Sequence, residues 1–209
     1  MAMLPIMVQL KNRRVLVVGG GSAARRKVST LCKAKARVIV VAPQVTKEIE
    51  QFAHEGKLRW WPRAFKADDC RCASLVVAAT DDRKTNSEVI RSARRHGAFA
   101  IACDGRRRST SFCATLRRGS LIFAVHSGGL APALSVHLKE RIAHLFGPEW
   151  QRVGAIFGSL RKQVKALSLS EKQELALWQS ILQGRAIEAI LAGDEKSYRE
   201  EVEQCISSL

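Results

Sequence analysis

The sequence predicts an α/β fold built on a Rossmann-like parallel sheet, followed by a helical region at the C-terminal end. Over the first hundred residues, short apolar runs alternate with stretches of helical spacing, which is typical of βαβ units with right-handed crossovers. A glycine turn, "VVGGGSAA" (17–24), directly follows the first apolar run. From Trp150 onward the pattern is helical throughout. A chain of 209 residues has room for one such domain and a smaller one.

The elements of the first half are marked by local signals. The β-branched run "RVIVV" ends before Pro43, and proline cannot donate to a strand ladder. Residues 23–34 combine helical spacing with good helix formers. We therefore expect strands at 15–18, 37–41, 58–61, 74–78 and 99–102, with helices at 23–34, at 45–54 and from the "TDDRKTN" segment to about residue 96.

A different pattern begins after Asp104. We expect a strand at 121–125 and then a helix that ends near Leu145. The stretch "SLSEKQE" (168–174) has a capping-box signature with Ser168 or Ser170 as the N-cap, and Asp194 is expected to start the last helix. These patterns divide the chain into a sheet domain at 1–113, a connecting segment at 114–149 and a helical domain at 150–209.

Gly19, Gly21 and Ala24 form the pattern G-x-G-x-x-A between the first strand and the first helix. In that context the first glycine permits a tight turn, the second lets the backbone approach a pyrophosphate, and the alanine keeps the helix close to the sheet. The helix N-terminus then presents backbone amides to the phosphates. A glycine-rich turn without a ligand is the alternative that the motif leaves open.

The residues after the second strand favour NAD as the cofactor. An acidic residue usually stands there to hold the adenosine ribose, but this chain has Ala42, Pro43 and Gln44. Gln44 offers a hydrogen bond to a hydroxyl group, and no arginine stands beside it to bind the 2′-phosphate of NADP.

Three polar residues follow strand ends, where ligands of open parallel sheets bind: Thr80, Asp81 and Asp104. For Asp81 and for Asp82, capping of the next helix explains the carboxylate equally well.

The charge of the chain is high and uneven. The net charge is +16, and residues 168–209 carry an excess of acids, so the basic charge lies in the first 167 residues. In the window 91–118, Asp104 is the only acid. Such a field attracts polyanions, namely nucleic acid, an acidic membrane or a small molecule with many carboxylates or phosphates. The basic run lacks the interleaved aromatic residues of a nucleic-acid stacking surface, so we expect no nucleic-acid partner.

Asp104 is a candidate proton acceptor. Surrounding guanidinium groups favour the ionised form of a carboxylate. A simple ion pair with Arg106 or a neighbour is the other interpretation. Further on, His126 precedes "SGG", where Ser127 either caps a polar turn or belongs to a backbone nest that receives an anion.

Other chemistries are disfavoured by spacing. Cys70-x-Cys72 does not fit a zinc knuckle or a redox pair, the five histidines do not cluster, and there is no phosphate loop of the Walker type, so no metal ligand is expected. The apolar runs are too short for a membrane span, and the first residues lack a signal-peptide pattern. We expect a cytoplasmic protein, without membrane contact, whose six cysteines are reduced and mostly buried.

Four blocks stand out together: "LPIMVQLKNRRVLVVGGGSAARRK" (4–27), "VVAATDD" (76–82) with Asn86, "IACD" (101–104) and "LRRGSLIFAVHSGGLAPALSVHLKERI" (116–142). In this order and spacing they resemble the precorrin-2 dehydrogenase/sirohydrochlorin ferrochelatase family, whose members occur alone or as the N-terminal part of a fused sirohaem synthase. The resemblance covers nearly the whole chain. It implies NAD-dependent oxidation of precorrin-2 to sirohydrochlorin, insertion of ferrous iron in some members, and a homodimer in which the segment 114–149 serves dimerisation and the tetrapyrrole site.

Carried over by position, the resemblance places four residues against NAD: Ser22, Ala23, Pro43 and Gln44. Asp104 falls on the aspartate that the family needs for catalysis, and Ser127 falls at the tetrapyrrole end of the site. Gly105 and three arginines stand where the family usually has a short Asp/Pro-bearing loop, and this departure argues more against iron insertion than against dehydrogenation.

The substrate that the resemblance implies carries eight carboxylates, and arginine binds both oxygens of a carboxylate at once. We therefore expect basic residues around it, with Lys139 and Arg141 as secondary candidates and these as the first: Arg106, Arg107, Arg108, Arg117, Arg118 and His126. For any one arginine, a solvated surface charge is the alternative. In this hypothesis Asp104 takes the proton that is released as a hydride leaves for NAD. A Rossmann module that binds NAD or a tetrapyrrole without chemistry is the competing interpretation.

Overall fold

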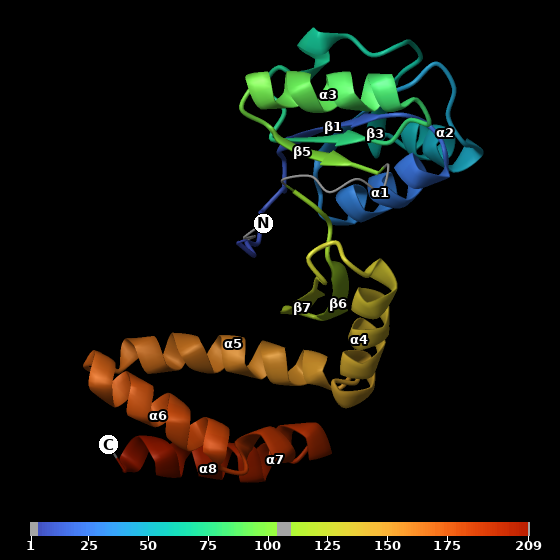
Figure 1. Ribbon diagram of the computed structural model, residues 1–209. Coiled ribbons are helices and arrows are strands. Elements are labelled where there is room, and N and C mark those ends of the chain that lie inside the picture. The colour runs from blue at the N-terminus through green and yellow to red at the C-terminus, as the bar shows by residue number, and fades with distance from the viewer. Residues whose placement is uncertain (1–3, 104–109, 209) are drawn as a thin grey trace. The chain divides into compact units, whose positions relative to one another are not determined.

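The computed structural model describes residues 4–103 and 110–208. The chain divides into two compact units, residues 1–112 (unit 1) and 113–209 (unit 2) (Figure 1). Each unit has a hydrophobic core of its own.

Unit 1 is a five-stranded parallel sheet with the order β3-β2-β1-β4-β5. The chain adds strands outward from β1 on one side and then returns to continue from β4 on the other. This is the order of a Rossmann sheet, and it confirms the predicted fold class. The strands are β1 (Arg14–Val18), β2 (Arg37–Val41), β3 (Leu58–Trp61), β4 (Leu75–Ala78) and β5 (Phe99–Ala102).

Helices cover both faces of this sheet (Figure 1). Helices α1 (Ser22–Lys33) and α2 (Lys47–His54) pack on one face, where they bury Val15 and Val17 of β1. Helix α3 (Arg83–Arg95) and the short 3₁₀ helix η1 (Ala67–Cys70) lie on the other face, with Leu16 and Val18. The alternation of β1 side chains between two cores explains why the strand is apolar at every position from Val15 to Val18.

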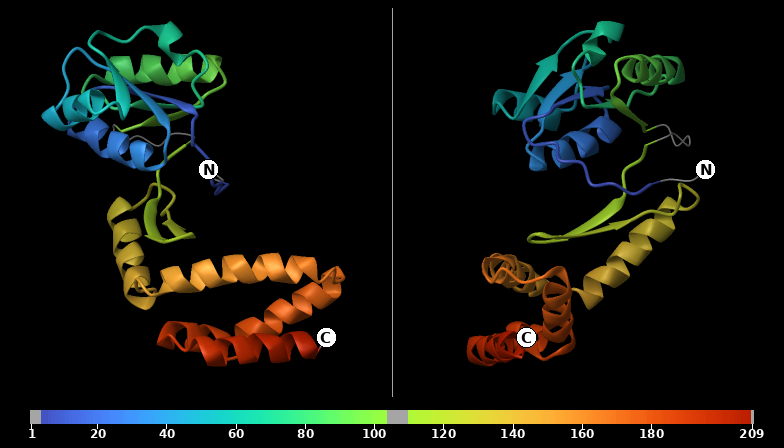
Figure 2. Two further views of the ribbon diagram at one scale, coloured as in Figure 1. Left: turned by 180° about the vertical axis from the view of Figure 1, so that it is seen from behind. Right: turned by 90° about the vertical axis from the view of Figure 1, so that its left-hand side faces the viewer.

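Unit 2 begins with an antiparallel hairpin of β6 (Ala114–Arg118) and β7 (Leu121–Val125). Gly119 has φ +58° in the turn between them, a conformation that favours glycine. Helix α4 (Pro132–Leu145) packs beside the hairpin (Figure 2). The sequence predicted β7 and α4, but it did not predict β6.

The rest of unit 2 is helical, as predicted: α5 (Trp150–Ala166), α6 (Glu171–Gln183), α7 (Ala186–Ala192) and α8 (Glu195–Ser207). Ser170 caps α6 in a capping box with Gln173, and Asp194 caps α8 through the amide of Ser197. The core of these helices contains Leu160, Leu177 and Ile181.

The structure also bears on the cysteines and on the possibility of a membrane span. All six cysteines are free thiols, but only Cys70 and Cys205 are buried and two are exposed, so the expectation of mostly buried thiols is wrong. No helix within 4–103 or 110–208 is both long enough and apolar enough to cross a bilayer.

Candidate nucleotide-binding site

The glycine turn lies at the carboxyl end of β1, between the carboxyl ends of β2 and β4. The amide of Gly19 donates to the Val41 carbonyl at 3.0 Å, and Thr46 donates to the carbonyl of Gly20 at 3.0 Å. A Cβ on Gly19, whose φ is +117°, would lie 2.2 Å from the carbonyl oxygen of Ala79. A Cβ on Gly20 would lie 2.0 Å from the carbonyl oxygen of Gln44. The backbone at the ends of both neighbouring strands therefore leaves no room for a side chain at either of the first two glycines.

Gly21 has a different environment, because a Cβ there would meet nothing within 4 Å. Gly21 is the N-cap of α1, which has no side-chain cap and no acidic residue in its first turn. The first turn of the helix thus has no carboxylate of its own, and there is free space beside its N-cap, which is the arrangement that a phosphate group needs. Ala24 is fully buried against the sheet, as the motif predicts.

The segment after β2 forms a second wall of this edge. Its Ala42 carbonyl accepts a hydrogen bond from the indole Nε1 of Trp60 at 2.9 Å, which holds the strand end in place. Pro43 and Gln44 follow and are exposed. Both residues thus lie accessible beside the glycine turn, where the sequence placed them.

Thr80 follows the carboxyl end of β4 and is held by Asn86. The fully buried Asn86 side chain donates to the Thr80 carbonyl at 2.8 Å, and its Oδ1 accepts from the Thr80 amide at 3.1 Å. No sequence motif predicts this role of Asn86, because a single asparagine in the first turn of a helix does not reveal whether its side chain is buried.

Asp82 is the N-cap of α3, where it accepts from the amides of Lys84 and Thr85. Hydrogen bonds from the Thr85 hydroxyl and from these amides lower the pKa of the Asp82 carboxyl. The capping interpretation is therefore confirmed for Asp82, which is the N-cap of α3, and both Asp81 and Asp82 are exposed.

Other site candidates fall in two places. The expected catalytic Asp104 and the arginines Arg106, Arg107 and Arg108 lie outside the described residues. The remaining candidates lie in unit 2: Arg117, Arg118, His126, Ser127, Lys139 and Arg141.

The "HSGG" segment forms a closed turn. Gly128 and Gly129 have φ +65° and +77°, and the Leu130 amide donates to the Ser127 carbonyl at 3.1 Å, as in a type I′ turn. The Ser127 hydroxyl accepts from the Ala131 amide at 3.2 Å, and His126 Nδ1 accepts from the Gly128 amide at 3.0 Å. These amides are used within the turn, so the geometry favours the polar-turn interpretation over an anion-binding nest.

Two adjacent arginines of β6 differ in their contacts. Arg118 Nε donates to the Phe146 carbonyl at 2.8 Å, and its Nη2 lies 3.4 Å from the carbonyl oxygen of Ala143, so Arg118 caps the end of α4. Arg117 is exposed. On α4, Lys139 lies 4.0 Å from Glu140, and Arg141 is exposed.

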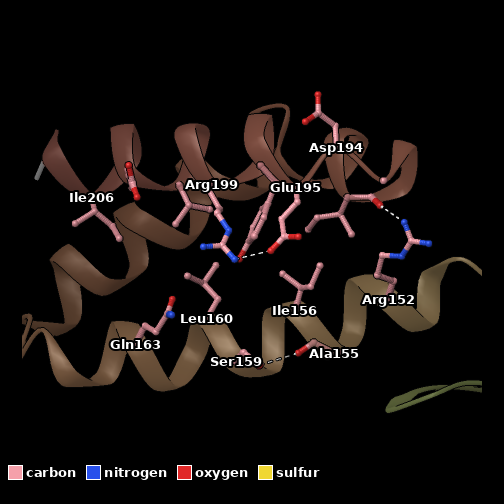
Figure 3. A pocket seen from close by; sticks show the side chains of 15 residues that line it. Arg152, Ala155, Ile156, Ser159, Leu160, Gln163, Asp194, Glu195, Arg199 and Ile206 are labelled. Carbon is pink, nitrogen blue, oxygen red and sulfur yellow. Dashed lines mark hydrogen bonds and ion pairs between the residues drawn. The ribbon is translucent and has the colours of Figure 1, made fainter.

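A groove of about 700 Å³ runs between α5 and α8 of unit 2 (Figure 3). Apolar side chains such as Ile156 and Leu160 line it, while Arg199 pairs with Glu195 at its rim. Within the described parts of both units, no three His, Cys, Asp or Glu side chains group in a way that would hold a metal ion.

Comparison with known proteins gives two family matches. Residues 6–114 match the family described as "Putative NAD(P)-binding", and residues 149–206 match the "Sirohaem synthase dimerisation region". The domain that carries the glycine turn is therefore of the NAD(P)-binding type.

Among curated proteins, the "Siroheme synthase" of Methylobacillus flagellatus is 35% identical over 208 residues, which cover 99% of this chain and 44% of the relative. "Siroheme synthase 3" of Aeromonas hydrophila subsp. hydrophila is 37% identical over 196 residues, which cover 93% of this chain and 42% of the relative. The chain thus spans less than half the length of these relatives.

Among solved structures, "SirC, precorrin-2 dehydrogenase" matches with a TM-score of 0.77 at 23% identity, covering 97% of this chain and 100% of that one. This likeness is one of fold. Because the first family match covers slightly more than half of the chain, the chain belongs to this NAD(P)-binding family, and its helical region matches the sirohaem synthase dimerisation region.

Proposed function

We propose that this protein oxidises precorrin-2 to sirohydrochlorin with NAD as the hydride acceptor, as a step of sirohaem synthesis. The observation that carries the proposal is the open N-terminus of α1 at Gly21, at the edge of the sheet where Rossmann domains bind dinucleotides. The NAD(P)-binding family match supports a nicotinamide cofactor, and the names of the sirohaem synthase relatives support a role in sirohaem synthesis.

In this proposal, residues at three strand ends bind different parts of the cofactor. Gly19 and Gly21 shape the turn, the amides of Ser22 and Ala23 receive phosphate, and Thr80 borders the site from β4. Pro43 and the exposed Gln44 lie at the adenosine end, where a side-chain amide suits the ribose hydroxyls of NAD. When bound, the nicotinamide ring accepts a hydride.

The proposed oxidation removes one hydride and one proton from precorrin-2. Asp104, by its correspondence with the family's aspartate, accepts the proton, so the carboxylate becomes a carboxylic acid as the hydride leaves the macrocycle. Guanidinium groups nearby in sequence favour the ionised starting form of this carboxylate.

We also propose that the carboxylates of the substrate are bound by four basic residues, Arg106, Arg107, Arg117 and His126. The Ser127 hydroxyl donates to the Ala131 carbonyl at 2.9 Å, so it serves the turn and not the substrate. The capping role of Arg118 makes it the least available of the predicted arginines.

A homodimer is part of the proposal. Unit 2 exposes large apolar side chains along α4, including Leu134, Leu138 and Leu145, and such a surface is typical of a face covered by another subunit. The dimerisation-region match over 149–206 supports the same conclusion for the helical part of unit 2. We assign the segment 114–149 to the contact with the second copy.

The test is an anaerobic incubation with precorrin-2 and NAD, followed by addition of ferrous iron, with the absorbance recorded in both stages. We expect NADH to appear with sirohydrochlorin in the first stage, and the second stage reports whether iron enters the macrocycle. Asp104→Ala should abolish the first stage while NAD still binds. A protein that binds both ligands without forming NADH is a non-catalytic module, and that result would refute the proposal.

A further inference from the structure

A basic concavity lies at the amino ends of β1, β2 and β3, the opposite end of the sheet from the glycine turn. Its volume is about 1050 Å³. The described residues that line it include no Asp or Glu, and six of them are cations: Arg14, Lys33, Lys35, Arg37, Lys57 and Arg59. At roughly 3.3 Å per strand residue, the length of β1 separates this concavity from the glycine turn.

Three of these cations share one face of the sheet. Arg14 is the register partner of Arg37, and Arg59 is the partner of Ile39. Register partners project to the same face, and so do residues two apart on one strand, which places Arg37 with Ile39. Adjacent strands are about 4.8 Å apart, so Arg14 and Arg37 project side by side, and Arg59 lies diagonally across from Arg37, two residues further along the sheet. Like charges directly opposite each other are unfavourable without an anion.

Nearby carboxylates compensate this charge only in part. The Asp69 side chain is occupied by Arg63, with two hydrogen bonds of 2.6 and 2.9 Å. Glu55 pairs with Lys57. Arg14 donates to the backbone carbonyl of Asp69 at 3.2 Å, but its buried Nε has no hydrogen-bond partner. Arg37 and Arg59 are exposed.

An aromatic surface completes the concavity. Trp61 follows Arg59 by two residues and therefore lies on the same face of β3. The Arg14 guanidinium carbon lies 5.8 Å from the centroid of its ring, and the ring is only partly buried. The Arg63 guanidinium also lies over this ring, 5.0 Å from its centroid, so the ring is bordered by two cations. A partly exposed aromatic ring bordered by guanidinium groups suits a ring ligand with carboxylates at its rim.

We propose that this amino-edge concavity is a second ligand site of unit 1 that binds an aromatic polycarboxylate. The cations line a concavity and do not form an extended basic groove, so the site favours a compact polyanion over nucleic acid. The assignment of the natural ligand as the tetrapyrrole rests on the proposed function, whereas binding of ring polycarboxylates in general does not.

The test uses uroporphyrin, an octacarboxylate tetrapyrrole, as the probe. Equilibrium dialysis gives affinity and stoichiometry, and the indole N–H resonance of Trp61, assigned with Trp61→Phe, reports local contact. We expect Arg37→Glu/Arg59→Glu to weaken the binding that shifts Trp61 by roughly tenfold or more. The control Lys162→Glu/Lys165→Glu reverses the same number of exposed charges on α5. It should change the affinity of the binding that shifts Trp61 by less than about twofold.

Equal losses in the two double variants, or no shift of the Trp61 resonance in the wild type, would overturn the inference. Preferential binding of a single-stranded oligonucleotide that competes with the probe would also overturn it. If the charge-reversed protein does not fold, Arg37→Gln/Arg59→Gln replaces it. This neutral variant should show a smaller loss of uroporphyrin affinity at the same site. Precorrin-2 turnover, measured in parallel, should stay unchanged in these variants, so failure of the second site is distinguishable from failure of the proposed reaction.

Discussion

At the scale of single residues, Gly19, Gly20 and Gly21 are consecutive but have different neighbours. The first two are enclosed by backbone carbonyls of Ala79 and Gln44, while the third faces open space. The pattern G-x-G-x-x-A predicted the roles of the first and third glycines. The pattern assigned no role to Gly20. A side chain at Gly20 would collide with the backbone of Gln44, which lies more than twenty residues later in the chain and becomes a neighbour only in the folded sheet.

This difference predicts opposite outcomes for two matched substitutions. Gly19→Ala should lower the free energy of unfolding by about 1–3 kcal/mol or more, because the new methyl group meets the Ala79 carbonyl and the backbone conformation is strained. Gly21→Ala should leave the melting temperature nearly unchanged but weaken NAD binding, because its methyl group occupies the space before the α1 amides. Chemical denaturation and calorimetric titration separate the two effects. Full NAD affinity in Gly21→Ala would contradict the assigned site.

Asp69 gives a pH-dependent prediction. Its burial acts to raise the pKa of the carboxyl, but hydrogen bonds from Arg63 and the Lys66 amide outweigh burial and lower it. The stabilisation is therefore fully present above the unfolded-state pKa of about 3.9 and is lost as the pH falls through the lower folded value.

We therefore expect Asp69→Asn to be less stable than the wild type by about 1–3 kcal/mol near neutral pH. The difference should shrink below about pH 4, where the wild type loses the same interaction. Urea unfolding at several pH values measures it. A difference that is constant down to pH 2 would show that the carboxylate charge contributes nothing.

At the scale of elements, the parallel strands were predictable and β6 was not. Strands β2, β3 and β5 have the predicted bounds, because each is a short apolar run between turn residues. Strand β6, "ATLRR", buries only Leu116, and it is a strand because it pairs with β7 and supports α4. Local sequence carries little trace of such tertiary stabilisation.

The same strand provides a matched pair of arginines. Arg118→Ala should destabilise the protein by about 1–2 kcal/mol, because it removes a charged donor from the carbonyls that end α4. Arg117→Ala should leave stability unchanged and, under the proposed function, raise the KM for precorrin-2. Thermal unfolding and steady-state kinetics on both variants make the comparison. Loss of stability in Arg117→Ala alone would reverse the two roles.

At the scale of the whole molecule, the exposed face of α4 predicts self-association. Leu134→Glu places a charge on that face and should weaken the dimer by roughly tenfold or more in Kd, because burying an unpaired charge is unfavourable. Leu4 is an exposed leucine of unit 1, so Leu4→Glu is the control and should leave the dimer intact. Sedimentation equilibrium over a concentration series measures both. A monomeric wild type would contradict the homodimer.

The positions of the candidate site residues follow from the sequence more readily than their contacts do. The glycine turn, the segment at 42–44 and Thr80 lie at one edge of the sheet, because a Rossmann order fixes which strand ends are neighbours. The arginines were predicted from charge density alone, and charge density does not say which guanidinium meets a ligand and which, like that of Arg118, meets a carbonyl of its own chain.

The hydrogen bonds described for the glycine turn and the strand ends beside it join groups within the first 103 residues. During synthesis on the ribosome, all of these partners emerge before the hairpin and helices of the second half exist. Domains generally fold as units in N-terminal order. Under the proposed function, a newly made chain thus has the residues of the dinucleotide site while translation is still under way, and early binding of the dinucleotide would stabilise the nascent sheet.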